Sequence, residues 1–379
     1  MILTSYYTGH GHASITSAMT SALDTTDVKY KVVDMVDLCG FFLKKRCKAY
    51  GKTTTKRPWL WNIYYKFSHK FVGMTNWFVR RSIKKRFLAE VFEFRPDVIV
   101  SNHPMFVGSV LDIIKKSEIP TKFATVVADL VSINNLWLDA RSDMIFLPTH
   151  EAMKIAEEKG LQENQIKQTT LPSRHIINEK AKTINFSQAP NNELVKCLVM
   201  SGGEGSGDLE GTIDTVISNK KTCVHAILGR NKILYDKLIE KYKDNHRVKI
   251  EGFVENIQEI IPTCDIAIVR GSPNVLMECI NLLVPIITTS CLPGQEQNND
   301  TWIYKNGFGL MCPDTSKLNE TIDKYLADDR ELLKQTRYNQ FHYRDLNAAS
   351  KTMSTIIEMA NNKTYLERKF KDRNFKSSR

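Results

Sequence analysis

Residues 196–208 read KCLVMSGGEGSGD, an apolar run followed at once by a glycine-rich turn. The run has the length and apolar content of a strand, and the residues after Asp208 have a helical pattern. Backbone amides in such a turn, together with the start of the next helix, can bind an anion such as a diphosphate. The stretch therefore predicts an α/β fold with a phosphate-binding turn, although a tight turn that only needs glycine's positive φ explains it equally well.

The same alternation of short strands and longer helices occurs in both halves of the chain, which is typical of parallel sheets covered on both faces. We expect strands at residues 2–7, 30–36, 98–101, 122–127 and 144–147, and again at 196–200, 224–228, 248–250, 266–269 and 286–289. A length of 379 residues suits two domains. The predicted parts are an N-terminal domain at 1–177, a polar linker at 178–193, a C-terminal domain at 194–344, and a C-terminal helix with a basic tail at 345–379.

The composition of the chain limits the classes of ligand and membrane contact to be expected. The formal net charge of +11 and the pI of about 9.1 favour anionic ligands or surfaces. The eight cysteines are scattered without the spacing of zinc sites or disulfide frameworks. No secretory signal and no apolar run of the ~20 residues that span a bilayer is visible. We therefore expect a cytoplasmic protein that is peripherally associated with the cytoplasmic face of the membrane.

A second glycine-bearing turn, YTGHGHAS at residues 7–14, follows the first predicted strand. Ligands of open α/β sheets bind at the carboxyl ends of strands, so the two turns could face one cleft. A histidine there could deprotonate an acceptor hydroxyl near neutral pH, and His12 is the better candidate. A solvated or capping histidine is the alternative explanation.

Polar residues after later strands suit a nucleotide sugar. Glu278 could bind both ribose hydroxyls, and Gln295 and Glu296 could bind hexose hydroxyls. Helix capping would also explain these residues. The chain has no Asp-x-Asp pair to hold a metal, so we expect no metal and no cofactor, with helix dipoles and amides stabilising the leaving diphosphate.

Together these motifs resemble glycosyltransferase family 28, and within it the monogalactosyldiacylglycerol synthases and processive diacylglycerol glucosyltransferases. The resemblance implies a GT-B fold, with two Rossmann-like doubly wound domains facing a central cleft, and metal-independent transfer with inversion. The matching stretches lie at residues 8–12, 95–104, 126–130, 160–174, 202–205, 228–231, 252–254, 264–266, 272–278 and 293–299.

The resemblance also implies roles for single residues. His12 is the implied catalytic histidine, and Asp129 is a second base or the partner that orients it. The implied acceptor-side residues are Gly11, His103 and Pro104. On the donor side the implied residues are Gly203, Glu204 and Gly205 at the diphosphate, Phe253 and Val254 as backbone contacts at the uracil, Glu278 at the ribose, Gln295 and Glu296 at the sugar, and Arg230, Ser272 and Asn299 in the matched motifs.

Cations alternate with aromatic residues between Phe41 and Phe94. An anionic membrane surface would attract this pattern. Single-stranded nucleic acid is a rival, which we consider the weaker one, and plain core packing explains many of the aromatic residues.

The sequence thus predicts a hexosyltransferase that moves glucose or galactose from a UDP-hexose to a diacylglycerol-type lipid. One alternative is transfer of N-acetylglucosamine from its UDP derivative to a polyprenyl-linked acceptor. Another is a non-catalytic module on the same fold that binds anionic ligands.

Overall fold

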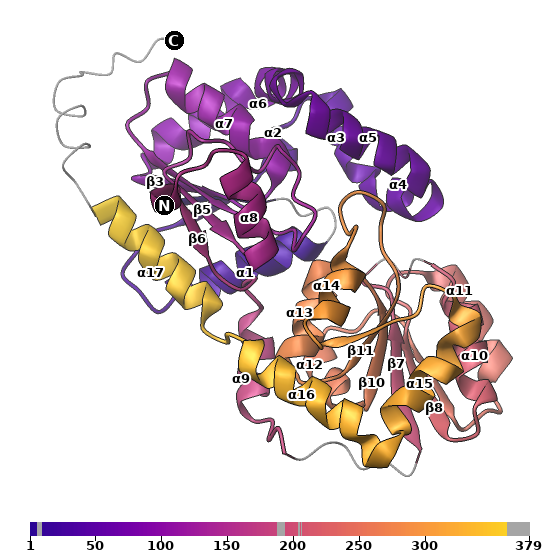
Figure 1. Ribbon diagram of the computed structural model, residues 1–379. Helices are drawn as coiled ribbons and strands as arrows, with labels where there is room; N and C mark the ends of the chain where they lie inside the picture. The colour runs from indigo at the N-terminus through magenta and orange to yellow at the C-terminus, as the bar shows by residue number, and fades with distance from the viewer. Residues whose placement is uncertain (6–9, 188–193, 204, 206, 362–379) are drawn as a thin grey trace. The chain divides into compact units, whose positions relative to one another are not determined.

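The computed structural model describes residues 1–5, 10–187, 194–203, 205 and 207–361. Its contacts divide these residues into two compact units, each of which combines helices with one sheet (Figure 1). Unit 1 holds the described residues of 1–50, 64–172 and 347–361, and unit 2 holds those of 51–63 and 173–346.

Unit 1 is built on a six-stranded parallel sheet with the order β2-β1-β3-β4-β5-β6. Its strands are β1 (Ile2–Ser5), β2 (Lys31–Asp34), β3 (Val98–Ser101), β4 (Lys122–Val126), β5 (Met144–Leu147) and β6 (Ile166–Gln168). The helices along this part of the chain are α1 (His10–Leu23), α2 (Met35–Leu38), α3 (Phe41–Lys48), α4 (Tyr50–Lys56), α5 (Pro58–Lys70), α6 (Val72–Phe94), α7 (Pro104–Lys116), α8 (His150–Glu158) and the short η1 (Glu163–Gln165). Residues 51–63, in α4 and the first half of α5, belong to unit 2.

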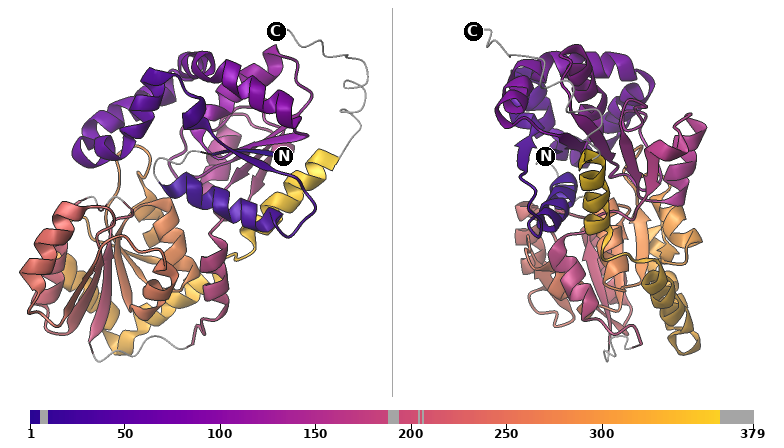
Figure 2. Two further views of the ribbon diagram at one scale, coloured as in Figure 1. Left: turned by 180° about the vertical axis from the view of Figure 1, so that it is seen from behind. Right: turned by 90° about the vertical axis from the view of Figure 1, so that its left-hand side faces the viewer.

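The last described helix, α17 (Ala348–Asn361), belongs to unit 1, where it packs against α1 and β4. Both views in Figure 2 show α1 and α17 side by side. The side chains of Met353 and Ile356 are buried in this contact region. The helical part of the predicted tail is therefore a packed element of the first unit.

Unit 2 has a second six-stranded parallel sheet, with the order β12-β11-β10-β7-β8-β9. Its strands are β7 (Val195–Met200), β8 (Thr222–Ile227), β9 (Val248–Glu251), β10 (Ile266–Arg270), β11 (Ile286–Ser290) and β12 (Gly309–Met311). Its helices are α9 (His175–Lys182), α10 (Leu209–Ser218), α11 (Lys232–Tyr242), α12 (Ile257–Ile260), α13 (Pro273–Asn281), α14 (Asn299–Lys305), α15 (Leu318–Leu326) and α16 (Glu331–Tyr343), with the short η2 (Ile261–Thr263), η3 (Thr315–Lys317) and η4 (Asp328–Arg330).

Helix α9 corrects one prediction, because it covers residues 178–182 of the predicted linker. Ile177, Asn178 and Ala181 are buried and the helix packs against α12 and α13. The polar composition of this segment reflects its outer face. Residues 188–193 of the same predicted linker lie outside the described part of the chain.

Each sheet has one point at which the strand order reverses direction. In unit 1 the chain moves from β1 to β2 on one side and from β3 to β4 on the other, so the loops after β1 and β3 diverge. In unit 2 the loops after β7 and β10 diverge in the same way. Such switch points leave a crevice at the carboxyl ends of the strands, where open α/β sheets bind ligands. The predicted doubly wound α/β architecture is confirmed for both units.

Candidate functional site

The switch point of unit 1 places His12 in the first turn of α1, beside the residues that follow β3. Its Nδ1 lies 2.6 Å from the backbone oxygen of Asn102. Because a carbonyl can only accept, Nδ1 carries the proton and the lone pair of the ring is on Nε2. The local fold therefore selects the tautomer in which Nε2 can act as a base.

Asn102 holds His12 a second time through its side chain. Its Nδ2 donates to the backbone oxygen of His12 and to Thr16 Oγ1, both at 2.9 Å. Thr16 Oγ1 is in turn 2.8 Å from Ser5 Oγ, at the end of β1. The side chain of Asn102 is fully buried. This residue, which the sequence analysis did not single out, thus ties the His12 turn to both central strands.

Burial keeps His12 neutral. Desolvation of the ring lowers the pKa of His12 to about 4, and the hydrogen bond to Asn102 offsets only part of that effect. The ring of His103 lies 4.4 Å away, centroid to centroid, and desolvation together with repulsion from His12 lowers the pKa of His103 as well. Neither imidazole is expected to carry a charge at pH 7.

The other predicted acceptor-side residues lie on the same edge of the sheet. His103 is the N-cap of α7, where its Nδ1 accepts a hydrogen bond from the Met105 amide at 3.3 Å, and Pro104 is the first residue of that helix. Gly11 lies in the first turn of α1. The structure brings these residues together with His12.

Asp129 reaches this group through Trp137. The indole Nε1 of Trp137 donates to Asp129 Oδ2 at 2.7 Å, and the Trp137 ring lies 6.2 Å from the His12 ring. Both residues are buried. Because the Nδ1 proton of His12 goes to the carbonyl of Asn102, that carbonyl and not the Asp129 carboxylate sets the tautomer. The proposed role of Asp129 as a second base stays a prediction.

The loops at the switch point of unit 2 carry several of the predicted donor residues. Gly203 and Gly205 follow β7, Arg230 follows β8, and Ser272 follows β10 as the N-cap of α13. Glu204, the remaining predicted diphosphate residue, lies outside the described residues. All these loops lie at the carboxyl edge of one sheet, as the sequence predicted.

The glycine turn packs directly on the loop after β8. Gly205 has a φ of +57°, and a Cβ there would lie 2.0 Å from the backbone oxygen of Leu228. The Arg230 amide donates to the Gly203 oxygen at 2.9 Å. Asn231, a further residue that the sequence analysis did not single out, donates from Nδ2 to the Gly205 oxygen at 3.1 Å while its Oδ1 caps α11. Glycine is required at Gly205 by close approach as well as by φ.

Phe253 and Val254 follow β9, at the position predicted for the uracil. The Phe253 side chain is 48% exposed, and the guanidinium of Arg230 lies 4.2 Å from its ring centroid. Arg230 and Phe253, which are predicted donor residues from two separate loops, are therefore in contact.

Glu278, the predicted ribose ligand, lies in α13 and is nearly fully buried. Desolvation raises the pKa of Glu278, and Arg174 opposes that shift. Arg174, which the sequence analysis quoted only as part of a matching stretch, donates from Nη2 and Nε to Glu278 Oε1 at 2.8 and 3.2 Å. The ion pair favours the ionised carboxylate that can accept hydrogen bonds.

The predicted sugar residues, Gln295 and Glu296, lie between β11 and α14, and Asn299 of the same matched motif is the first residue of α14. Gln295 is partly exposed, whereas Glu296 and Asn299 are buried. Glu296 is bound by Arg270, and Asn299 donates from Nδ2 to the Gly271 oxygen at 2.8 Å. Their contact with a hexose stays a prediction.

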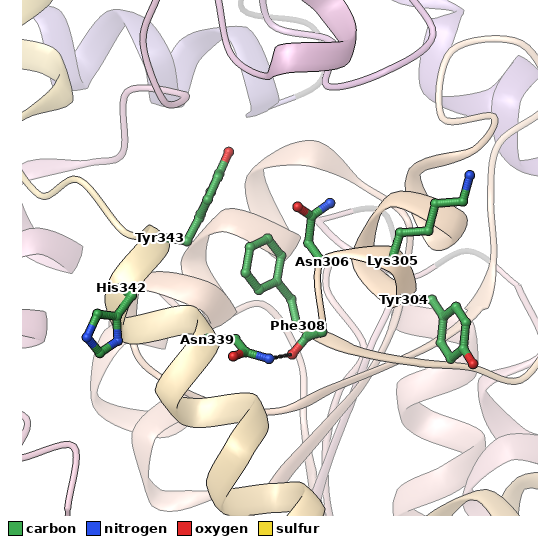
Figure 3. A pocket seen from close by; sticks show the side chains of 8 residues that line it. Tyr304, Lys305, Asn306, Phe308, Asn339, His342 and Tyr343 are labelled. Carbon is green, nitrogen blue, oxygen red and sulfur yellow. Dashed lines mark hydrogen bonds between the residues drawn. The ribbon is translucent and has the colours of Figure 1, made fainter.

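A separate hollow of about 530 Å³ opens between α14 and α16 (Figure 3). Phe308 and Tyr343 line it with rings 4.7 Å apart, and Asn339 donates to the Gly307 oxygen beside them. Gly307 and Phe308 precede β12, so this hollow lies at the amino end of a strand. The predicted donor residues lie at the opposite, carboxyl edge.

Within the described ranges, no three His, Cys, Asp or Glu side chains are grouped so that they could hold a metal ion. The expectation that transfer needs neither metal nor cofactor stays a prediction.

Comparison with known proteins shows which family the chain is similar to. The profile of the monogalactosyldiacylglycerol (MGDG) synthase family matches residues 12–172. The chloroplastic MGDG synthase of Spinacia oleracea is 26% identical over 330 residues, which cover 81% of this chain and 62% of the relative. The chain thus spans about three fifths of that relative's length.

Solved structures give the fold. MurG of Acinetobacter baumannii aligns with a TM-score of 0.64 and 11% identity over 94% of this chain and 99% of its own. Os79 from O. sativa, solved in complex with UDP, aligns with a TM-score of 0.65 and 10% identity over 95% of this chain and 100% of its own. The predicted resemblance and fold are confirmed: this chain is similar to the monogalactosyldiacylglycerol synthases and has the GT-B fold of the glycosyltransferases.

Proposed function

We propose that the protein transfers glucose or galactose from a UDP-hexose to the hydroxyl of a diacylglycerol-type lipid. The observation that carries this proposal is the neutral, doubly anchored His12 at the switch point of unit 1. A base that removes a hydroxyl proton must be unprotonated at working pH and fixed in one tautomer. His12 meets both conditions.

The proposed binding of the UDP-hexose donor is supported by residues of unit 2. Glu278, which is paired with Arg174, can accept hydrogen bonds from both ribose hydroxyls. The start of α10 is capped by Asp208, whose Oδ1 accepts from the Gly211 amide. The start of α13 has no side-chain cap, so its first amides and its dipole are the better place for the diphosphate. Os79, a structural neighbour, was solved with UDP.

The proposed reaction is a single displacement. His12 Nε2 takes the proton of the acceptor hydroxyl while the oxygen of that hydroxyl bonds to the anomeric carbon of the hexose. The bond from that carbon to the diphosphate oxygen breaks, and UDP leaves with the electron pair. Attack from the side opposite the leaving group inverts the anomeric centre. Fixed amides and the dipole of α13 stabilise the charge that develops on UDP.

Transfer to a lipid acceptor is supported by the similarity to the MGDG synthases and by a basic–aromatic surface on unit 1. This basic–aromatic surface consists of Phe41, Phe42, Lys45, Arg46 and Tyr64. The two phenylalanines are 75% and 80% exposed, and the Arg46 guanidinium lies 5.4 Å from the Tyr64 ring centroid. Exposed aromatic residues beside cations suit the interface of an anionic membrane, where each cation contributes about 1 kcal/mol.

No helix in the described part of the chain is long and apolar enough to cross a bilayer. We therefore propose peripheral attachment through the basic–aromatic surface. In a flotation assay with anionic vesicles, the F41S/F42S variant should no longer float with the vesicles. The I233S variant, which removes an equally exposed apolar side chain from α11, should float like the wild type.

The activity itself is tested with labelled donors. Purified protein is incubated with UDP-glucose, UDP-galactose or UDP-N-acetylglucosamine and with vesicles that contain diacylglycerol or a polyprenyl phosphate. A hexosyl diacylglycerol identified by mass spectrometry supports the proposal. A product formed only on the polyprenyl carrier would replace it with the alternative acceptor.

Calorimetry separates an enzyme from a binding module. The proposal expects UDP binding that weakens about 10- to 100-fold in Glu278→Ala, because the variant loses hydrogen bonds to a charged group. Glu240→Ala removes a surface ion-pair partner on α11 and should leave UDP affinity unchanged. Absence of UDP affinity in the wild type would contradict a transferase.

A further inference from the structure

One of the side chains expected to bind the hexose points into the protein. Glu296 is 4% exposed, and both of its carboxylate oxygens are occupied. Arg270 approaches with Nη2 at 3.0 Å from Oε1 and Nε at 3.0 Å from Oε2, and the Leu292 amide donates to Oε2 at 2.8 Å. Arg270 is the last residue of β10, so the pair joins the loop to the central strand of the sheet.

Residues 291–298 form the loop between β11 and α14, and further contacts fix its two ends on Gly271. The Gly271 amide donates to the Ser290 oxygen at 2.8 Å, and Asn299 Nδ2 donates to the Gly271 oxygen at 2.8 Å. A Cβ on Gly271 would lie 2.4 Å from Cys291 Sγ. Arg270 and Gly271 therefore hold the start, the middle and the end of this loop.

The energies favour leaving this arrangement intact when a donor binds. Pulling Glu296 away would leave Arg270 and the Leu292 amide without that partner in a buried setting. Breaking one side of a buried ion pair is far more costly than one hydrogen bond to a neutral sugar hydroxyl can repay. Gln295, in contrast, is partly exposed.

We propose that Glu296, Arg270 and Asn299 are positioning residues that set the 291–298 loop, and that Glu296 does not contact the hexose. Gln295 is then the side chain of this loop that meets the sugar. The inference rests on the proposed function for the identity of the ligand, but the geometry of the loop is independent of it.

The test is a cycle between protein and donor. Values of kcat/KM are measured for wild type, E296Q, R270M and the double variant, with UDP-glucose, UDP-galactose and their 3-, 4- and 6-deoxy analogues. A positioning role predicts that E296Q lowers kcat/KM by the same factor for every donor, about 10- to 100-fold. R270M should cost a similar factor, and the double variant no more than the worse single one.

A direct contact predicts a different pattern. If Glu296 binds one hydroxyl, E296Q should hardly lower kcat/KM for the analogue that lacks that hydroxyl. The inference would then be wrong. Additive losses in the double variant would also overturn it. Q295A should show this dependence on one hydroxyl, whereas E296Q should not.

A second measurement needs no turnover. Labelling of Cys291 by a thiol reagent, followed by peptide mass spectrometry, reports whether the loop has left Gly271. E296Q and R270M should both label Cys291 faster than the wild type, with Cys223 in β8 as the internal reference. Equal rates would overturn the inference. A wild type without hexosyl transfer contradicts the proposed function alone.

Discussion

The loops at the β1–β3 switch point of unit 1 and at the β7–β10 switch point of unit 2 hold the same place in their sheets, yet they treat charge in opposite ways. Around His12 the fold supplies a backbone carbonyl, a second imidazole and an indole. In unit 2 the buried acids Glu278 and Glu296 are each paired with an arginine.

The difference shows how one topology is adapted to two tasks. A base must lose its charge to accept a proton, and burial without a carboxylate on Nδ1 achieves that for His12. A carboxylate that binds hydroxyls or shapes a loop must keep its charge, and Arg174 supplies the counter-charge for Glu278. The local partners, and not the sheet, therefore decide the chemistry.

The largest effect is expected from His12→Ala, which removes the base of unit 1 and leaves unit 2 unchanged. General-base catalysis contributes typically 10²- to 10⁴-fold, so kcat should fall by about that factor. The Kd of UDP, measured by calorimetry, should stay within about twofold. His150→Ala, an exposed histidine at the start of α8, is the control and should keep full turnover. An unchanged kcat in His12→Ala would contradict the assignment of His12 as the base.

The pH dependence comes next. Burial lowers the pKa of His12 from 6.5 to about 4, so the ring stays unprotonated as the pH falls from 7 to 5. We expect kcat/KM to be flat over that range and to fall only as the pH approaches 4. A histidine with the ordinary pKa would lose about 30-fold by pH 5. A break near pH 6.5, with the fold intact by circular dichroism, would show that His12 is not kept neutral.

The sequence predicted strands with continuous apolar runs and missed the short edge strands. β6 contains one buried residue, Ile166, and β12 begins at Gly309, so neither has a run to detect. Helix α9 was hidden by the polar residues of its outer face. The packing of α17 on α1 joins the two ends of the chain, which no local pattern reveals.

Among the site residues, too, only those with a local signature in the sequence were predicted. Glycines and His12 were visible because a turn after a strand has a local signature. Asn102 and Arg174 were not selected, because their importance lies in partners 90 and 104 residues away, His12 and Glu278. Glu296 was visible as an acid, but its partner Arg270 was not.

A smaller effect is expected when the backbone contact in unit 2 is disturbed. Gly205→Ala places a Cβ 2.0 Å from the Leu228 oxygen at a positive φ, and strain of about 1–3 kcal/mol should displace the glycine turn. UDP affinity should weaken about 10-fold or more. Gly207→Ala is the matched control, since its φ of +90° carries similar strain with open space around the Cβ. Equal losses in both variants would assign the effect to strain and not to close packing.

The smallest effect is expected at Phe253, because its predicted contact with the uracil is made by the backbone. Phe253→Leu removes the ring under Arg230, and an exposed cation–π contact contributes about 0.5–1 kcal/mol. The Kd of UDP should therefore rise about 2- to 5-fold. Tyr338→Leu, which shortens another exposed aromatic residue of unit 2, should leave the Kd unchanged. A loss of 100-fold at Phe253 would mean that its ring binds the base directly, and unit 2 would then depend on an aromatic contact much as unit 1 depends on the rings around His12.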